Sequence, residues 1–270
     1  MKTEIMENNN QNLEQNKKPY VSVIIPTYNE EVRKDEMKKH LISIGEHFNR
    51  IGKSYEIVVV LDGPTDKTAE LVQSYAREFE NIKVIDRKEN KGKGFSVREG
   101  FMKASGEYRL FTDMDGATPI AMFDRVLPKI EEEFEIIIGS RDMEETEIKK
   151  HQPKLKEWLG DLGNLLIQFI GGLWGIKDTQ CGFKVFSSKA VEDIIPRTTV
   201  DRWGLDFEIL MIGKKRGFKI AEVPVEWIDS GDSLVGISGY ISTFKDLFSV
   251  RWNMIKGVYQ LDKSIEEMKK

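Results

Sequence analysis

The 270-residue chain is poor in cysteine and histidine, with one Cys and three His. The single Cys181 excludes an internal disulfide framework and favours a reducing compartment. The histidines and the cysteine are widely scattered, so they form no zinc-binding pattern. These absences exclude both a disulfide scaffold and a zinc site of the usual spacing.

Long apolar runs and excess positive charge are also absent. No segment offers about 18 consecutive apolar residues, so no transmembrane helix is expected. The net charge is −4, which leaves no broad electrostatic basis for binding nucleic acid. The first residues are polar and lack the apolar core of a signal peptide, so we expect residues 1–19 to form a disordered tail.

Common cofactor and hydrolase motifs are missing as well. Gly52-Lys53-Ser54 resembles the end of a phosphate-binding P-loop, but His47 stands where the first Gly is required. Gly92-Lys93-Gly94 lacks the third Gly of a dinucleotide fingerprint, because Val97 occupies that position. No Gly-x-Ser-x-Gly motif of a hydrolase is present.

Apolar runs and helical stretches alternate through the first half of the chain, and 40% of all residues are apolar. The expected strands are residues 21–25 (closed by Pro26), 56–61, 82–85, 108–112 and 134–138. The expected helices are residues 30–50, 68–79, 94–104 and 120–132. This alternation predicts an α/β fold, with parallel β-α-β units and one sheet covered by helices on both faces.

The second half of the chain is less regular. We expect a helix over 155–174, a loop leading into a strand over 179–185, a helix over 205–216, a strand over 218–227 and an amphipathic stretch over 240–261. The stretches 155–174 and 240–261 each have a broad apolar face. Such a face can lie in a membrane interface, bury against its own sheet or form a dimer contact.

Polar residues follow all five strands expected in the first half. They are Thr27-Tyr28-Asn29-Glu30, Asp62-Gly63, Asp86-Arg87, Asp113-Met114-Asp115 and Gly139-Ser140-Arg141. Because ligands of parallel sheets bind beyond the carboxyl ends of the strands, we expect these residues at one site. Asp113 and Asp115 can share a divalent cation that keeps open positions for phosphate oxygens. Alone, Asp-x-Asp is a weak signal in a chain with 45 acidic residues.

Several motifs, in the same order along the chain, resemble those of the family 2 inverting glycosyltransferases, which have the GT-A fold. They are residues 23–30 (VIIPTYNE), 60–68 (VLDGPTDKT, with Leu61 where an Asp is common), 90–94 (NKGKG) and 98–100 (REG). Residues 113–118 (DMDGAT), 178–184 (DTQCGFK) and 202–208 (RWGLDFE) are similar to motifs of the dolichyl-phosphate β-glucosyltransferase branch. The resemblance covers roughly residues 21–227 and implies a mostly parallel sheet flanked by helices, with amphipathic interface helices.

The resemblance also implies an organisation and an activity. It implies a GT-A glycosyltransferase domain over 20–235, including the amphipathic helix near 155–174, and a C-terminal amphipathic helical extension over 236–270. The enzyme would use Mg²⁺ or Mn²⁺ to move glucose from UDP-glucose onto a polyprenyl or dolichyl phosphate. It would act as a peripheral protein at the cytoplasmic face of a membrane, and an oligomer is compatible with these features.

Two alternatives stay open. One is a family 2 enzyme that glycosylates a soluble glycan or protein acceptor. The other is a non-catalytic protein that binds nucleotide sugars.

On the donor side, the resemblance assigns the nucleoside pocket to the residues after the first strand, Pro26, Thr27, Tyr28 and Glu30. Asp62 would accept the uracil N–H, since a carboxylate is purely an acceptor. Lys93 would contact the phosphate or the nucleoside. Asp113 would face the ribose or the sugar, and Asp115, with Asp113 beside it, would bind the metal.

On the acceptor side, we expect the site to need cationic side chains that position the phosphate, rather than a general base. A phosphomonoester has a second pKa of about 6, so at neutral pH it attacks without losing a proton. Arg141 and Arg202 are the leading candidates for the acceptor phosphate, because guanidinium matches phosphate with a planar fork. Lys184 is a weaker candidate. Asp206 and Glu208 would orient the sugar or an Arg.

Two departures from the family pattern narrow these expectations. Ala117 stands where mannosyltransferase relatives carry Gln, which favours the glucosyl branch and leaves fewer protein ligands for a metal. Ser233-Leu234-Val235 lacks the Lys that lipid-phosphate relatives often carry there. The acceptor phosphate must then rely on other cations, or the acceptor differs.

Overall fold

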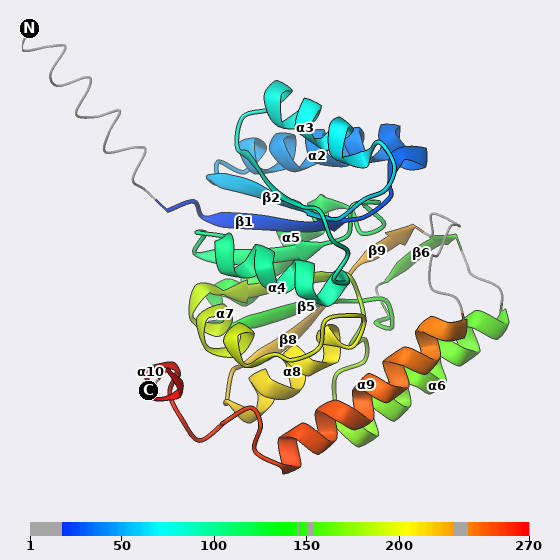
Figure 1. Cartoon of the computed structure of the whole chain (residues 1–270), viewed down its shortest axis with the longest axis vertical. Coiled ribbons are helices and arrows are strands. Elements are labelled where there is room, and N and C mark those ends of the chain that lie inside the picture. The colour runs from blue at the N-terminus through cyan, green and yellow to red at the C-terminus, as the bar shows by residue number, and fades with distance from the viewer. Residues whose placement is uncertain (1–17, 145, 151–153, 229–236, 270) are drawn as a thin grey trace, which may run out of the picture.

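The computed structural model describes residues 18–144, 146–150, 154–228 and 237–269. Seven strands form one central sheet in the order β3-β2-β1-β4-β7-β5-β8 (Figure 1). All are parallel except β7, which runs antiparallel to both of its neighbours, β4 and β5. A second sheet pairs β6 with β9. The predicted α/β class with a mostly parallel sheet is confirmed.

The strands are β1 (Val21–Thr27), β2 (Tyr55–Asp62), β3 (Ile82–Arg87), β4 (Tyr108–Thr112), β5 (Ile136–Ser140), β6 (Glu147–Lys150), β7 (Phe183–Ser187), β8 (Ile220–Pro224) and β9 (Glu226–Ile228). The α-helices are α2 (Lys34–Arg50), α3 (Thr68–Glu78), α4 (Lys93–Lys103), α5 (Phe123–Glu131), α6 (Lys154–Gly171), α7 (Ser188–Ile194), α8 (Leu205–Lys215), α9 (Ile237–Ile255) and α10 (Ile265–Met268). Short 3₁₀ turns lie at Glu31–Arg33, Ile120–Met122 and Ile195–Arg197.

Helices cover both faces of the sheet, so alternate residues of its strands enter two different apolar clusters. Val58 and Val60 of β2 pack in one cluster with residues of α4, α7 and α8. Val59 and Leu61 point the other way, into a cluster with residues of α2, α3 and α5. This two-sided burial explains why the strands appear in the sequence as continuous apolar runs rather than as alternating ones.

Several element boundaries differ from those expected. The helix expected from residue 30 begins as the 3₁₀ turn and continues as α2. Pro26 lies inside β1, where its missing N–H is tolerated because pairing with β4 ends at Ile24. The strand expected over 218–227 is two strands, since the chain leaves the central sheet after Pro224 and β9 pairs with β6 instead.

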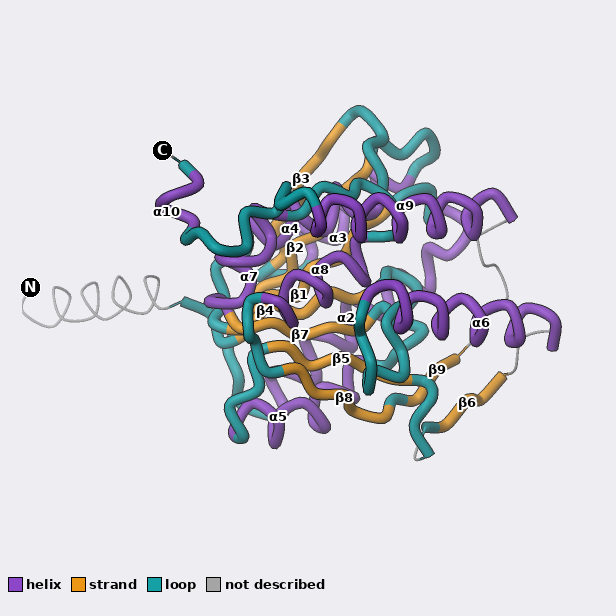
Figure 2. The backbone as a smooth tube through the Cα atoms, turned by 90° about the horizontal axis from the view of Figure 1, so that it is seen from below, coloured by secondary structure: helices purple, strands orange, loops and turns teal. Residues whose placement is uncertain are grey.

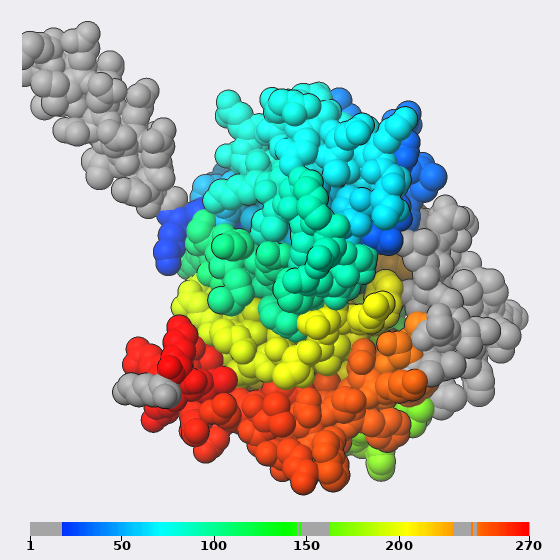
Figure 3. Space-filling model, in the orientation of Figure 1, coloured from blue at the N-terminus to red at the C-terminus, as the bar shows by residue number. Residues whose placement is uncertain are grey.

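The helices α6 and α9 pack side by side along one edge of the molecule, away from α2 and α3 (Figure 1). Figure 2 shows the pair beside the sheet, seen at right angles to the first view. In the space-filling view α9 forms the lower rim, in orange (Figure 3). No helix in the described part of the chain is long and apolar enough to cross a membrane.

Candidate active site

The loops after β1 and β2 are joined by hydrogen bonds at the carboxyl edge of the sheet. Asn29 adopts a left-handed conformation, with φ of 52°. Its side-chain nitrogen donates to Thr65 Oγ1 at 3.1 Å, and its Oδ1 accepts from the backbone N of Thr65 at 2.8 Å. The backbone N of Glu30 donates to Thr68 Oγ1 at 2.7 Å. The two polar clusters predicted at this edge therefore form one surface.

Arg33 joins the loop after β1 to the loop after β4. Its Nε lies 2.9 Å from Glu30 Oε2, and its Nη1 lies 3.9 Å from Asp115 Oδ2. Burial raises the pKa of Glu30 to about 7; Arg33 opposes this rise, and the charges of Asp115 and Asp113 add to it. Sequence reasoning did not select Arg33, although its spacing of three from Glu30 on a helical turn was a usable signal.

Asp113 and Asp115 follow β4 and carry different contacts. Lys93 Nζ lies 2.6 Å from Asp113 Oδ1, and the backbone N of Ala117 donates to Asp115 Oδ1 at 3.0 Å. Burial, and next the Asp113 charge, raise the pKa of Asp115. Burial lowers the pKa of Lys93, but the charges of Asp113 and Asp206 outweigh it, so the net shift is upward. Carboxylates and cationic side chains therefore lie next to one another in this site.

Gly182 gives the Asp113 side chain its room. A Cβ at this position would lie 2.0 Å from Asp113 Oδ2 and 2.8 Å from its Cγ. The glycine lies just before β7, the antiparallel strand beside β4. Gly182 belongs to the motif at residues 178–184, but the sequence pattern alone assigns it no role.

The carboxylates of this edge suit a hard divalent cation such as Mg²⁺ or Mn²⁺, which prefers oxygen ligands. Asp113 and Asp115 could hold such an ion, with Glu30 near them. Within the described ranges, no group of three or more His, Cys, Asp or Glu side chains is close enough to hold a metal alone. Asp113 and Asp115 would therefore supply part of the ligands of such an ion.

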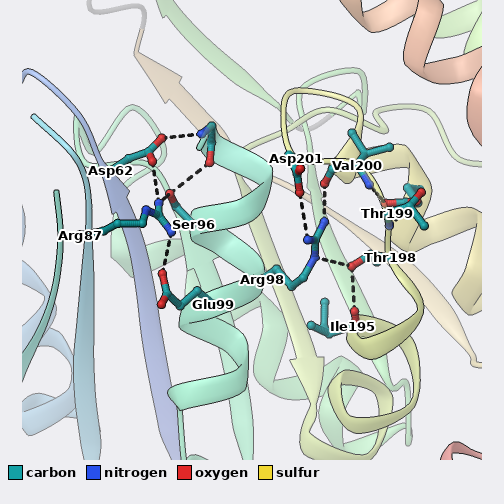
Figure 4. A network of polar contacts seen from close by, with 12 residues as sticks. Asp62, Arg87, Ser96, Arg98, Glu99, Ile195, Thr198, Thr199, Val200 and Asp201 are labelled. Carbon is teal, nitrogen blue, oxygen red and sulfur yellow. Dashed lines mark hydrogen bonds and ion pairs between the residues drawn. The ribbon is translucent and has the colours of Figure 1, made fainter. Parts of the chain in front are cut away.

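Asp62 ends β2 and holds the start of α4 in place (Figure 4). Its Oδ1 lies 2.6 Å from Arg87 Nη2 and accepts from the backbone N of Lys91 at 2.8 Å, while its Oδ2 accepts from the backbone N of Gly92 at 2.9 Å. A carboxylate offers about four acceptor positions, so one position remains on Asp62, which is only 4% exposed.

The residues at the end of β1 are placed differently from one another. Thr27 is buried, and its hydroxyl donates to the carbonyl of Ile25 at 3.2 Å. Tyr28 is 37% exposed, so its ring is accessible to a ligand. Pro26 is half-buried within the strand. Of the four residues predicted to line the nucleoside pocket, Pro26, Thr27, Tyr28 and Glu30, Tyr28 is the most open to solvent.

Arg141 follows β5 and forms a two-pronged ion pair with Asp178. Its Nε donates to Asp178 Oδ2 at 2.6 Å and its Nη2 to Oδ1 at 3.0 Å. Burial alone would lower the pKa of Arg141, but the Asp178 charge raises it above its ordinary value. The guanidinium also lies over the ring of Trp227 in β9, 5.6 Å from its centroid. Its remaining N–H groups are the ones that a phosphate could use.

Arg202 and Asp206 lie together with Lys93, where they line one small recess with Phe111 and Leu205. Asp206, in the first turn of α8, pairs with the buried ammonium of Lys184 at 2.5 Å.

The structure corrects the expectation for Lys184, and it places Glu208 in the interior of the protein. The Lys184 side chain is fully buried against Asp206 and the Cys181 carbonyl, so it anchors Asp206 instead of meeting a phosphate. Glu208 is also fully buried and accepts from the backbone N of Thr199. The segment at Ser233-Leu234-Val235 lies outside the described residues.

The chain resembles known proteins in both sequence and fold. Residues 22–195 match the family model described as Glycosyl transferase family 2. The dolichyl-phosphate beta-glucosyltransferase of Dictyostelium discoideum is 36% identical over 92% of this chain and 80% of its own length. The protein of the same name from Saccharomyces cerevisiae is 32% identical over 90% of this chain and 78% of its own length.

Among solved structures, glucosyl-3-phosphoglycerate synthase from Mycobacterium tuberculosis, in complex with Mn²⁺, uridine diphosphate and phosphoglyceric acid, superposes with a TM-score of 0.65. The two chains are 16% identical, and the match covers 86% of this chain and 78% of the other. This likeness confirms the GT-A fold. Because the family model matches well over half of the chain and these relatives exceed 30% identity, the chain belongs to glycosyl transferase family 2, in its dolichyl-phosphate β-glucosyltransferase branch.

Proposed function

We propose that the chain transfers glucose from UDP-glucose to a polyprenyl or dolichyl phosphate, with the help of Mg²⁺ or Mn²⁺. The main observation in support is the cluster of Asp113, Asp115, Lys93 and Arg33 at the carboxyl ends of parallel strands. The names of the sequence relatives support the lipid phosphate and the glucose. The Mn²⁺ and UDP-glucose complexes of the structural neighbour support the metal and the donor.

On the donor side, the nucleoside would lie against the end of β1. Tyr28 would contact the base, with Pro26 and Thr27 forming the wall behind it, and Asp62 would accept the uracil N–H. Glu30 would line the same pocket.

The diphosphate would lie beside Lys93 and Arg33, whose charges suit its oxygens. Asp115, with Asp113, would hold the metal, which supplies positive charge that stabilises the departing UDP. Asp113 also borders the position expected for the sugar.

On the acceptor side, an oxygen of the lipid phosphate forms a bond to C1 of glucose while the bond from C1 to UDP breaks, with inversion at C1. The phosphate dianion needs no general base. Arg202 is the leading partner for that phosphate, since it borders the recess beside Lys93 and Asp206. Arg141 is a second candidate through the N–H groups that Asp178 does not use. Asp206, fixed by Lys184, would orient the sugar or Arg202.

We further propose that α6 and α9 dock peripherally on the cytoplasmic face of a membrane. Both helices and the residues after them carry exposed apolar side chains, namely Leu165, Phe169, Trp174, Phe248, Trp252, Ile255 and Val258. On α9, Lys245 and Arg251 are also exposed, and so is Lys256 just after the helix. An apolar face with aromatic and basic residues suits an anionic bilayer surface.

Vesicle sedimentation tests this docking. Phe169→Ser with Trp252→Ser is expected to weaken binding to vesicles that contain phosphatidylserine. Met102→Ser, an exposed apolar residue on α4, serves as the matched control and should leave binding unchanged. Unchanged binding of the double variant would contradict the membrane role of this face.

The activity is tested by incubating the protein with a panel of UDP- and GDP-sugars, Mn²⁺ or Mg²⁺, and dolichyl phosphate. A glucosylated lipid formed from UDP-glucose is expected. Transfer to a soluble glycan or protein with no lipid product would overturn the proposed acceptor. Binding of UDP-glucose without turnover across the panel would instead identify a nucleotide-sugar-binding protein.

A further inference from the structure

Helix α4 contacts both halves of the proposed site through two neighbouring residues, Arg98 and Glu99 (Figure 4). Glu99 faces the donor half, where its Oε2 lies 2.6 Å from Arg87 Nη1. Arg87 in turn pairs with Asp62 at 2.6 Å. Through this chain of charges, Glu99 supports the carboxylate to which we assign the uracil.

Arg98 faces the other way, toward the segment 198–204 that leads into α8. Its Nε donates to Thr198 Oγ1 at 2.9 Å, its Nη2 to the carbonyl of Val200 at 2.7 Å, and its Nη1 to Asp201 Oδ1 at 3.0 Å. The carbonyl of Asp201 also accepts from the backbone N of Phe95 in the first turn of α4, at 3.0 Å. One guanidinium thus ties three positions of the segment to the helix.

The segment is in direct contact with the start of α4. Gly92 has a φ of 102°, and a Cβ there would lie 2.4 Å from the carbonyl oxygen of Asp201. Arg202 follows at once, and it borders the recess shared with Lys93 and Asp206. A displacement of the segment from α4 would therefore move Arg202 away from Lys93.

Two other contacts hold the same segment from different sides. The buried Glu208 accepts from the backbone N of Thr199 at 2.8 Å and from that of Val200 at 3.0 Å. Asp246 of α9 accepts from the backbone N of Gly204 at 3.3 Å. Glu208 thus holds Thr199 and Val200 from α8, and Asp246 holds Gly204 from α9, whereas Arg98 ties Asp201, the residue before Arg202, to α4.

We propose that Arg98 is a positioning residue for the acceptor phosphate. It holds the segment 198–204 against α4 and thereby keeps Arg202 beside Lys93 and Asp206. The proposal rests on the proposed function. It gives Arg98 a role that involves no contact with either substrate. A Lys at this position could pair with Asp201 but could not reproduce the fork of donors.

Steady-state kinetics with separate variation of the two substrates tests the proposal. Arg98→Ala is expected to raise the KM for dolichyl phosphate about tenfold or more, because several charge-assisted hydrogen bonds are lost. The KM for UDP-glucose should stay within about twofold of wild type, and Arg98→Lys should restore part of the loss. Glu99→Gln should raise the KM for UDP-glucose and leave the KM for dolichyl phosphate near that of wild type. Arg77→Ala, on the exposed side of α3, should change neither KM.

Hydrogen exchange by mass spectrometry gives a readout that does not depend on turnover. In Arg98→Ala, amides of 198–204 should exchange faster, while those of β2 should keep their protection. Unchanged acceptor KM and unchanged exchange would overturn the proposal, and so would an equal rise of both KM values with a general loss of protection. Failure of the proposed function is distinguishable, because the wild-type protein itself would then form no glucosylated lipid.

Discussion

Gly182→Ala adds one methyl group next to Asp113 and removes no functional group. The new Cβ would lie 2.0 Å from Asp113 Oδ2, whereas ordinary contact begins near 3.4 Å. Gly182 is not among the residues with positive φ, so alanine brings no backbone strain there. The perturbation therefore acts on the position of the Asp113 carboxylate.

The size of the effect follows from this distance. The carboxylate has to move by about 1.4 Å to regain ordinary contact, a large shift beside the 2.6 Å between Asp113 Oδ1 and Lys93 Nζ. A displacement of about 1 Å at a reacting centre costs roughly 100-fold in rate. We expect kcat for glucosyl transfer to fall by about that factor, with a stability loss of about 1–3 kcal/mol from overpacking.

The assay is steady-state transfer from UDP-glucose to dolichyl phosphate, with urea denaturation to verify that the variant is folded. Gly163→Ala in α6 is the matched control, since a Cβ there meets nothing within 4 Å. The control should keep wild-type kcat. A folded Gly182→Ala protein with kcat within about twofold of wild type would refute the role given to Asp113.

Three further predictions concern carboxylates of the same region. Asp115→Asn should abolish glucosyl transfer, and added Mn²⁺ should not restore it. Wild-type turnover in this variant would contradict the metal role. Because burial raises the pKa of Glu30 from 4.5 to about 7, the folded state keeps a proton that the unfolded state releases, so wild-type stability should fall as pH rises between these values. In Glu30→Gln this slope should flatten in urea titrations at pH 5 to 8, and an unchanged slope would exclude Glu30 as its source. Asp178→Asn removes the partner of Arg141 and should lower the free energy of unfolding by about 3–5 kcal/mol in urea; a loss below about 1 kcal/mol would disprove that anchoring.

The elements of the first half could be predicted because their sequence pattern and their burial agree. A strand such as β2, covered on both faces, must be apolar throughout, and its sequence is. Helix α7, which has seven residues, and strand β6, which has four, are too short to give such a pattern. For α7 a local sign existed, since Ser187 caps the helix by accepting from the backbone N of Ala190.

The site was predictable where its residues follow strand ends directly, as Asp113 and Asp115 do. It was not predictable where function depends on pairing between distant segments. Lys184 is a lysine in a strand, and only its full burial against Asp206 shows that it is an anchor. Arg33 likewise gains its meaning from Asp115, which lies far along the chain.

The position of β7 has a consequence for the order in which the chain folds. This strand lies between β4 and β5, yet it is made after both of them. Until Ser187 has left the ribosome, β4 has one unpaired edge and nothing joins the half-sheet β3-β2-β1-β4 to β5. Strand β5 then has neither of its neighbours, since β8 is made later still. Open edges of this kind invite pairing with other chains. The nascent protein is therefore exposed to aggregation from the synthesis of β5 onwards. The insertion of one antiparallel strand, β7, closes the edge of β4 and one edge of β5, and β8 later closes the other.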